Sequence, residues 1–392
     1  MDPAERLSSK QKQISISEFF EKNKHFLGFD TLQRSIITAV KEAVDNSLDA
    51  CEEARILPEI HVEIKRMKGD RLSLITLDNG PGIPREDIEN VFGKFLLGSR
   101  FHAIRQTRGQ QGIGITGVVM YSQLTAGSKT KVVSKIAKDS SAVFVELGID
   151  TRRNRATKSG ETRDIWLDEK TEESVSHGLR IECEMRAKYQ RGRQSVHQYL
   201  RMTSIVNPHA SISLVVRDRD GSIIEEGDWQ RTTERLPREV SEIRPHPHGI
   251  QLGSLQRMLR ESEERKMTSF LRHNFSGVSM RAAREILAAA GLDEGRSPKR
   301  ISADDAQGMV TAFRKVKLLA PPTDCLSPIE DLLIKQGLSK AIDSRFASTI
   351  TRSPKVTQGN PFQIEVGLVF GGALSAEGPI EVLRFANRVT LM

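Results

Sequence analysis

Lys41-Glu-Ala-Val-Asp-Asn-Ser-Leu-Asp-Ala50 is the stretch that decides the fold, and it lies on a predicted helix that Asp30 is expected to cap. Glu42 and Asn46 are four residues apart, and Asp49 follows three residues later, so the three side chains share one helical face. A carboxylate there can take a proton from water, and an amide oxygen can bind Mg²⁺. The alternative is the solvated face of an amphipathic helix.

A second segment, Asp78-Asn-Gly-Pro-Gly-Ile83, follows a predicted apolar strand over residues 72–77. The carboxylate of Asp78 can accept a hydrogen bond from the exocyclic amine of adenine. Gly80 and Gly82 allow the backbone to approach a ligand closely, and the proline between them stiffens the loop. An isolated segment of this kind would be interpreted as a plain Asn-Gly turn between two elements.

A third segment, Gly109-Gln-Gln-Gly-Ile-Gly-Ile-Thr116, opens a helix that is predicted over residues 112–123. Backbone N–H groups and the positive end of a helix favour an anion at such a place. The segment lacks the Gly-Lys-Ser/Thr ending of a P-loop, and it does not follow the first strand as a dinucleotide-binding fingerprint does. In this order, the three segments predict a site for ATP and Mg²⁺.

The composition is that of a globular protein with room for two or three domains in 392 residues. No run of 18 apolar residues occurs, so no membrane span is predicted, and the polar N-terminus does not resemble a signal peptide. Three widely spaced cysteines suggest neither a disulfide framework nor a zinc site. A cytoplasmic location is expected.

The net charge of +8 favours a polyanionic partner. Residues 90–138 contain no Asp or Glu, and the positive charge there surrounds the glycine-rich segment, so part of it is expected to serve a phosphate group. Residues 185–201 form a second basic stretch, with Arg186, Lys188, Arg191, Arg193 and Arg201. That stretch is either a contact for double-stranded DNA or a solvated face.

Periodicity and turn residues predict a mixed sheet with helices over one face in the first part of the chain. The expected strands span residues 61–65, 72–77, 131–136, 142–149, 179–185 and 212–217; the expected helices span 85–92, 112–123 and 194–205, besides the helix from Asp30. Residues 152–170 are polar and are predicted to form a hairpin tip.

Beyond a proline cluster near residues 235–248, the patterns over 254–261, 279–290 and 303–315 are helical and predict a small all-helical module. A short helix over 329–336, a clean strand over 362–370 and the beginning of another strand over 380–387 follow. These last elements are too few for a complete domain, so the chain is expected to be a fragment or an unusually short member of its kind.

The three segments resemble the nucleotide boxes of the GHKL ATPase superfamily, and most specifically those of the B subunits of type IIB DNA topoisomerases. Five further stretches share the resemblance: Phe95-Leu-Leu-Gly-Ser-Arg-Phe101, Val118-Val-Met-Tyr-Ser-Gln123, His246-Pro-His-Gly-Ile250, Pro321-Pro-Thr-Asp-Cys-Leu-Ser-Pro328 and Gln358-Gly-Asn-Pro-Phe-Gln-Ile-Glu-Val-Gly367. The resemblance implies an α+β protein in four parts. These are an N-terminal strap (1–29), a GHKL (Bergerat) α/β sandwich (30–235), a helix–two-turn–helix module (246–320) and the start of an α/β transducer domain (321–392).

The resemblance also implies a role for each matching residue. Glu42 would activate the water, Asn46 would bind Mg²⁺, and Asp78 would recognise adenine, with Gly80 and Gly82 in its loop. The remaining nucleotide-binding positions would be Ser99, Arg100, Gly109, Gln110, Gln111, Gly112, Ile113, Gly114, Ile115 and Thr116.

The chain departs from the family at two places. Many relatives carry Gly-Thr on a late strand near the adenine, where this sequence has Gly178-Leu179. The family's transducer lysine, which reaches the terminal phosphate, would lie beyond Met392.

As an activity, the resemblance implies ATP-dependent DNA topoisomerase action. An ATP-dependent dimer of B subunits would capture one DNA duplex and pass it through a double-strand break, relaxing supercoiled DNA. The break would be made by the A subunit of topoisomerase VI in an A2B2 heterotetramer. The alternatives are a GHKL ATP-switched clamp for DNA or protein without strand passage, and a nucleotide-binding scaffold that does not hydrolyse ATP.

Overall fold

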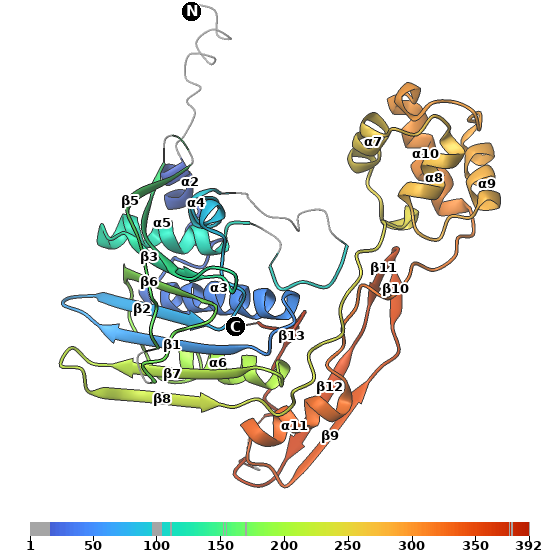
Figure 1. Ribbon diagram of the computed structural model, residues 1–392. Helices are drawn as coiled ribbons and strands as arrows, with labels where there is room; N and C mark the ends of the chain where they lie inside the picture. Colours follow the sequence, from blue (N-terminus) through green and yellow to red (C-terminus); the bar gives the residue numbers. More distant parts are fainter. Residues whose placement is uncertain are drawn as a thin grey trace, which may run out of the picture.

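The computed structural model describes residues 16–95, 104–109, 112–151, 153, 155–168, 171–375, 377 and 379–391. Figure 1 shows a broad sheet with helices packed on it, an extended arm of strands from the last part of the chain, and a separate helical module at the far end of that arm. A short helix, α2 (Ile16–Lys22), precedes the sheet, and its Phe20 is fully buried in the main core.

The main sheet has eight strands in the order β5-β4-β3-β6-β2-β1-β7-β8. Their bounds are β1 (Glu59–Arg66), β2 (Arg71–Asp78), β3 (Thr130–Lys135), β4 (Ala142–Asp150), β5 (Arg155–Asp164), β6 (Gly178–Arg186), β7 (Ser211–Arg217) and β8 (Ile223–Trp229). The pair β1–β7 is parallel, and the other neighbouring pairs are antiparallel. The predicted mixed sheet is therefore confirmed.

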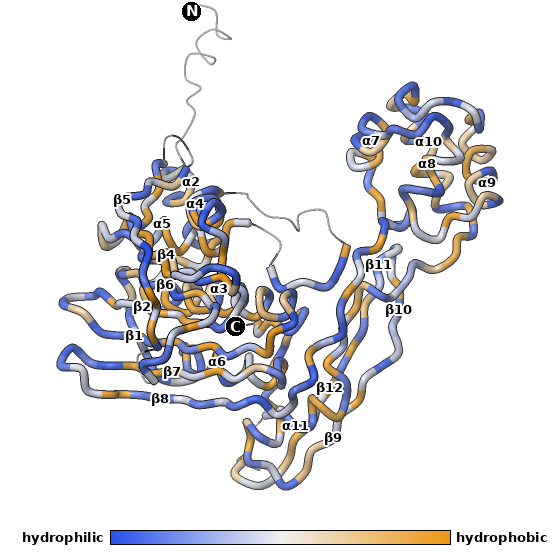
Figure 2. The backbone as a smooth tube through the Cα atoms, viewed as in Figure 1, coloured by the Kyte–Doolittle hydropathy of each residue, from blue (hydrophilic) through white to orange (hydrophobic). Residues whose placement is uncertain are grey.

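One helical layer covers the sheet and consists of α3 (Leu32–Glu53), α5 (Gly114–Ala126) and α6 (Val196–Val206). Helix α3 contacts both α5 and α6, and alternate side chains of strands such as β7 are buried beneath the layer. A shorter helix, α4 (Arg85–Gly93), packs on α5 and on the β4–β5 edge. Figure 2 shows apolar segments gathered between this layer and the sheet. The core thus fixes α3 and the start of α5 relative to the end of β2.

Two expectations for this part need correction. The N-cap of α3 is Thr31, whose side chain accepts a hydrogen bond from the N–H of Arg34; Asp30 instead forms an ion pair with the Arg34 guanidinium. The polar segment predicted as a hairpin tip contains β5, an edge strand paired with β4. Most of its side chains are exposed, so it lacks the apolar alternation by which strands are recognised.

The helical module contains α7 (Leu252–Glu261), α8 (Met267–Asn274), α9 (Met280–Ala290) and α10 (Ala303–Lys315), with 3-10 turns at Pro247–Gly249 and Pro298–Arg300. These helices enclose a core of their own, built around Phe270, Phe275 and Phe313. The sequence patterns predicted α7, α9 and α10 and missed α8, whose eight residues span too few turns to show a clear apolar periodicity.

The last part of the chain contains α11 (Asp331–Ala341) and three small two-stranded sheets. The strands are β9 (Phe346–Thr351) with β12 (Glu365–Phe370), β10 (Lys355–Thr357) with β11 (Asn360–Phe362), and β13 (Phe385–Ala386) with β14 (Val389–Thr390). The strand expected over 380–387 is thus only two residues long. Helix α11 packs on β9 and β12, and Figure 2 shows apolar residues along these strands, of which Phe346, Leu368 and Phe370 are exposed.

Candidate nucleotide site

A cavity of about 1230 Å³ lies between α3, the loop after β2 and the N-terminus of α5. It brings together ten of the predicted site residues: Glu42, Asn46, Asp78, Gly82, Gly109, Gly112, Ile113, Gly114, Ile115 and Thr116. Gly80 lies beside this cavity, within hydrogen-bonding distance of Asp78. Ser99, Arg100, Gln110 and Gln111 lie outside the described residues.

Glu42 stands on the third turn of α3 with its carboxylate half-buried at the cavity wall. Burial raises the pKa of Glu42, although the Lys41 ammonium, 3.6 Å from Oε1, acts in the opposite direction. Lys41 also donates a hydrogen bond of 3.0 Å to Asp45, which in turn accepts one from the hydroxyl of Tyr199. A carboxylate with a raised pKa at a cavity is suited to take a proton from water.

Asn46 is exposed to the cavity, one helical turn beyond Glu42. Its amide oxygen is a ligand type that Mg²⁺ accepts, and Mg²⁺ usually keeps several waters and is bound by few protein groups together with phosphate oxygens. Within the described residues, no group of three or more His, Cys, Asp or Glu side chains could hold a metal ion without such help. One amide beside an anion cavity therefore fits a Mg²⁺ ion that arrives with a phosphate ligand.

Asp78 ends β2 and is buried at the bottom of the cavity. Its Oδ2 accepts a hydrogen bond of 2.5 Å from the hydroxyl of Ser47, and its Oδ1 accepts one of 2.9 Å from the N–H of Gly80. Burial raises the pKa of Asp78, while these hydrogen bonds act to lower it. The backbone N–H of Leu179 is a further hydrogen-bond partner of this carboxylate. A carboxylate held by several donors keeps a fixed orientation, and its two oxygens offer about four lone-pair sites, so one remains for an amine.

Gly82 lies closer to the end of β3 than a residue with a side chain could. Its φ is +71°, in the left-handed region, and a side chain there would overlap the carbonyl of Lys135 at the end of β3. The loop that carries Asp78 is also tied to β3 by Ser134, whose hydroxyl accepts from the N–H of Ile83 at 2.7 Å. The loop that follows β2 is thus also fastened to β3.

Helix α5 begins at Gly114 with its N-terminus facing the cavity. The N-cap residue is Ile113, which has no side-chain oxygen, so the first backbone N–H groups have no side-chain cap. Gly114 lies directly against Glu42, because a side chain on it would overlap Oε2 of that carboxylate. The anion-binding end of α5 and the carboxylate on α3 are therefore adjacent across the cavity.

The side chain of Thr116 is engaged by a neighbouring helix. Its hydroxyl donates to the carbonyl of Val91 on α4 at 3.3 Å, so the side chain fastens α5 to α4 and does not point to a ligand. Leu179, next to Gly178 on β6, lines the cavity with an apolar side chain, in agreement with the departure that the sequence shows at this position.

Sequence reasoning missed two residues of this region. Ser47 follows Asn46 directly on α3, and its contact with Asp78 could have been suspected, since a hydroxyl on the core side of a helix needs a partner. Arg108 directly precedes the glycine-rich segment, and it was predicted only as one of the basic residues of 90–138, part of whose charge was expected to serve a phosphate group. It is buried and bonded to Asp49 and Glu52 of α3, which no local spacing reveals.

The second basic stretch is partly engaged within the chain. Arg186 pairs with Asp70 at 3.7 Å and Arg191 with Glu225 at 3.4 Å, while Arg201 donates to the carbonyl of Ala341. No helix of the described part of the chain is both long and apolar enough to cross a membrane.

Comparison with known proteins places this site in a family. The family described as "Histidine kinase-, DNA gyrase B-, and HSP90-like ATPase" matches residues 31–185, and the family "Topoisomerase VI B subunit, transducer" matches residues 321–392. These matches, with the mixed sheet and its helices, confirm the predicted fold class: a GHKL ATPase domain and a transducer region.

Three proteins, each named as the B subunit of type 2 DNA topoisomerase 6, are similar over almost the whole chain. The protein of Methanococcoides burtonii is 51% identical over 99% of this chain, that of Archaeoglobus fulgidus 45% over 98%, and that of Pyrococcus horikoshii 36% over 100%. The chain spans 61%, 62% and 75% of the length of these relatives, respectively. The chain therefore belongs to the family of type 2 DNA topoisomerase 6 B subunits.

Proposed function

We propose that the chain binds and hydrolyses ATP as the B subunit of a type IIB DNA topoisomerase. The observation that carries the proposal is the contact between Glu42 and Gly114, which sets a carboxylate with a raised pKa beside the uncapped N-terminus of α5. A base next to an anion cradle is the arrangement that hydrolysis of a phosphate anhydride requires.

In this proposal the residues divide the work by their position. Asp78, oriented by Ser47, accepts the exocyclic amine of adenine at the bottom of the cavity. The backbone N–H groups of residues 109–116 hold the phosphates at the N-terminus of α5. Mg²⁺, held by Asn46, would neutralise phosphate charge when it is bound. Glu42 takes the proton from the attacking water.

We further propose that the partners of the chain are DNA and the A subunit of the topoisomerase. The net charge of +8 supports a polyanionic ligand, and the relatives are named as B subunits, which implies a complementary A subunit. In the proposed cycle, ATP closes a dimer of B subunits around one duplex, and the A subunit cuts the second duplex through which the first passes. The predicted division at residues 29, 235, 246 and 320 remains part of this proposal.

The test of the site is ATP turnover by the chain with Mg²⁺, compared with the Glu42→Gln variant. We expect the variant to bind ATP with unchanged affinity and to lose turnover by about a hundredfold or more. Equal turnover by both proteins would remove Glu42 as the base.

The test of the activity is relaxation of supercoiled plasmid by the chain mixed with a topoisomerase 6 A subunit. Relaxation that requires both proteins and ATP supports the proposal. ATP turnover that DNA stimulates, without relaxation, would favour an ATP-switched clamp.

A second test is the salt dependence of DNA binding. The affinity of the chain for duplex DNA should fall steeply as the salt concentration rises, and an affinity that does not change with salt would argue against a DNA partner.

A further inference from the structure

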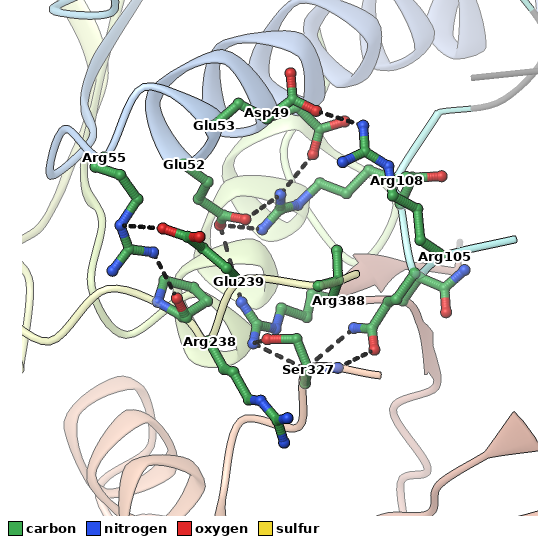
Figure 3. A pocket seen from close by; sticks show the side chains of 15 residues that line it. Asp49, Glu52, Glu53, Arg55, Arg105, Arg108, Arg238, Glu239, Ser327 and Arg388 are labelled. Carbon is green, nitrogen blue, oxygen red and sulfur yellow. Dashed lines mark hydrogen bonds and ion pairs between the residues drawn. The ribbon is translucent and has the colours of Figure 1, made fainter. Parts of the chain in front are cut away.

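A buried cluster of charged residues lies behind the nucleotide cavity, where α3 meets the last residues of the chain (Figure 3). Arg108 donates to Asp49 at 2.7 Å and to Glu52 at 2.6 and 3.0 Å, and a second guanidinium, that of Arg388, lies 3.9 Å from the same Glu52 carboxylate. The side chains of Arg108 and Arg388 are only 4% and 7% exposed. Residues far apart in sequence thus share one carboxylate.

The cluster is electrically balanced only when all four charged groups are present, since two arginines face Asp49 and Glu52. Burial alone would raise the pKa of Glu52, but Arg108 and the hydrogen bond from His209 hold it well below its usual range. Burial lowers the pKa of Arg388 to about 10, and the nearby Arg108 acts in the same direction while Glu52 opposes it. The two guanidinium groups therefore depend on the carboxylate between them.

Arg388 belongs to the two-residue turn between β13 and β14. Asn387 and Arg388 have φ angles of 52° and 64°, and such a turn needs positive φ at both positions. Asparagine adopts this conformation readily, whereas arginine does not. The strained backbone is held because the Arg388 guanidinium donates to the carbonyl and hydroxyl of Ser327 at 2.8 Å and to the carbonyl of Pro328 at 3.2 Å.

The same turn reaches the nucleotide cavity. Asn387 is exposed and lines both that cavity and the smaller one of about 220 Å³ beside the charged cluster. Arg108, the arginine that donates to Glu52, directly precedes Gly109, the first residue of the phosphate-binding segment. The turn of residues 387–388 is therefore the place where the last part of the chain meets the start of the phosphate-binding segment.

We propose that Arg388 is a positioning residue of the nucleotide site, which fixes the phosphate-binding segment through Glu52 and Arg108. The inference rests on the proposed ATP function. In the ATP-bound form, the phosphate-binding segment needs a fixed starting point, Arg108, so that its backbone can surround the terminal phosphate. Arg388 helps to fix Arg108 because it faces the Glu52 carboxylate to which Arg108 is bonded. Arg388 also donates to residues 327–328, so it links the phosphate-binding segment to them.

A purely structural role is the competing explanation, in which Arg388 only docks the last part of the chain on the sheet domain. Arg201 offers a matched control, because it also joins the two parts, with hydrogen bonds of 3.0 and 2.5 Å from its guanidinium to the carbonyl of Ala341. Among the hydrogen bonds and ion pairs of the described residues, the Arg201 guanidinium contacts neither Arg108 nor Glu52. If docking alone mattered, loss of either arginine would have the same consequence.

The experiment measures the affinities of the full chain for ADP and for a non-hydrolysable ATP analogue, with Mg²⁺, by calorimetry. In Arg388→Gln we expect the analogue to bind about tenfold more weakly and ADP to bind within about twofold of wild type, so that the preference for the third phosphate is lost. Arg388→Lys keeps the charge and should recover part of the preference. Arg201→Gln should keep the wild-type ratio.

A double-mutant cycle makes the path itself testable. Glu52→Gln combined with Arg388→Gln removes one cation and one anion, so the buried cluster stays neutral and the double variant should fold at least as well as Arg388→Gln alone. If Arg388 acts through Glu52, the double variant should show no greater loss of preference than the larger single effect. Additive losses would overturn the proposed path.

The outcomes separate the inference from the function on which it rests. A wild-type chain that binds neither nucleotide would refute the proposed function. A wild-type chain that prefers the triphosphate, with the same preference in Arg388→Gln, would overturn the inference alone. Equal loss in Arg388→Gln and Arg201→Gln would show that docking, and not positioning, is the role of Arg388.

Discussion

Gly114 touches Glu42: the first residue of α5 lies so close to the carboxylate on α3 that any side chain at this position would overlap Oε2. The glycine therefore has a geometric function beyond the flexibility expected of a glycine-rich loop. It allows the N-terminus of a helix, which attracts anions, to stand next to the base that would act on the bound anion.

Gly114→Ala should displace the Glu42 side chain and reduce ATP turnover by about tenfold or more, because a misplaced base loses its hydrogen-bonding reach. The overlap is with the end of a flexible side chain, so the melting temperature should change little. Turnover and thermal unfolding would be measured together. Gly253→Ala in α7 is the control, since a methyl group there meets open space. Unchanged turnover in Gly114→Ala would show that the contact is incidental.

The pH dependence of turnover should report the ionisation of Glu42. A base acts in its ionised form, so activity is present above its pKa and is lost as the pH falls through it. Because burial raises this pKa above the ordinary 4.5, the acid limb of kcat should lie above that value. Lys41→Gln removes the cation that opposes the shift, and it should move the limb to still higher pH. An acid limb that shifts to lower pH in Lys41→Gln would contradict the assignment of Glu42 as the base.

Ser47→Ala should weaken ATP binding about fivefold, the equivalent of about 1 kcal/mol, because Asp78 loses the donor that orients Oδ2.

Asp78→Asn should remove the preference for adenine, since the amide can present a donor in place of the acceptor. Competition between ATP and GTP for the site measures both effects. Equal affinity of the wild-type chain for the two nucleotides would refute the role of Asp78.

Arg108→Gln should lower the free energy of unfolding by about 3–5 kcal/mol, because Glu52 is left buried without its principal cation. The pKa of Glu52 is held below its ordinary value of 4.5, so the stabilisation is present above that pH and is lost as the pH falls further. Urea unfolding at pH 7 and under acid would show both effects. Arg281→Gln on α9, an exposed arginine paired with Glu285, should unfold like wild type.

The sequence was most informative where the chemistry is local. Glu42 and Asn46 share a helical face, and Asp78 follows a strand of clear apolar character, so local patterns were enough to select each segment. Their order, their chemistry and the resemblance to the GHKL nucleotide boxes then predicted that they form one site. The strands of the sheet interior were predicted for the same reason, since their buried faces alternate with period two. The edge strand β5 was not predicted, because most of its side chains are exposed and no apolar alternation results.

The rest could not be predicted because it depends on contacts across long separations in sequence. Nothing near Arg108 indicates that it bonds to α3, and nothing near Arg388 indicates that it shares Glu52 with Arg108. The same limit applies in part to Ser47: its place on the core side of α3 indicates that the hydroxyl needs a partner, but not that this partner is Asp78, 31 residues away. Such contacts are set by the packing of elements, and local patterns do not encode packing.

The parallel pairing of β1 with β7 has a consequence for how the protein is made. The partner of Glu59 in this ladder is Ser211, which is 152 residues later (211 − 59). On the ribosome, β1 can therefore gain its second neighbour only after the chain has been synthesised past β7, although β2 is available at once. Pairing across such a separation is slow, so the half-built sheet should need protection from aggregation during synthesis, and the nucleotide site should mature late.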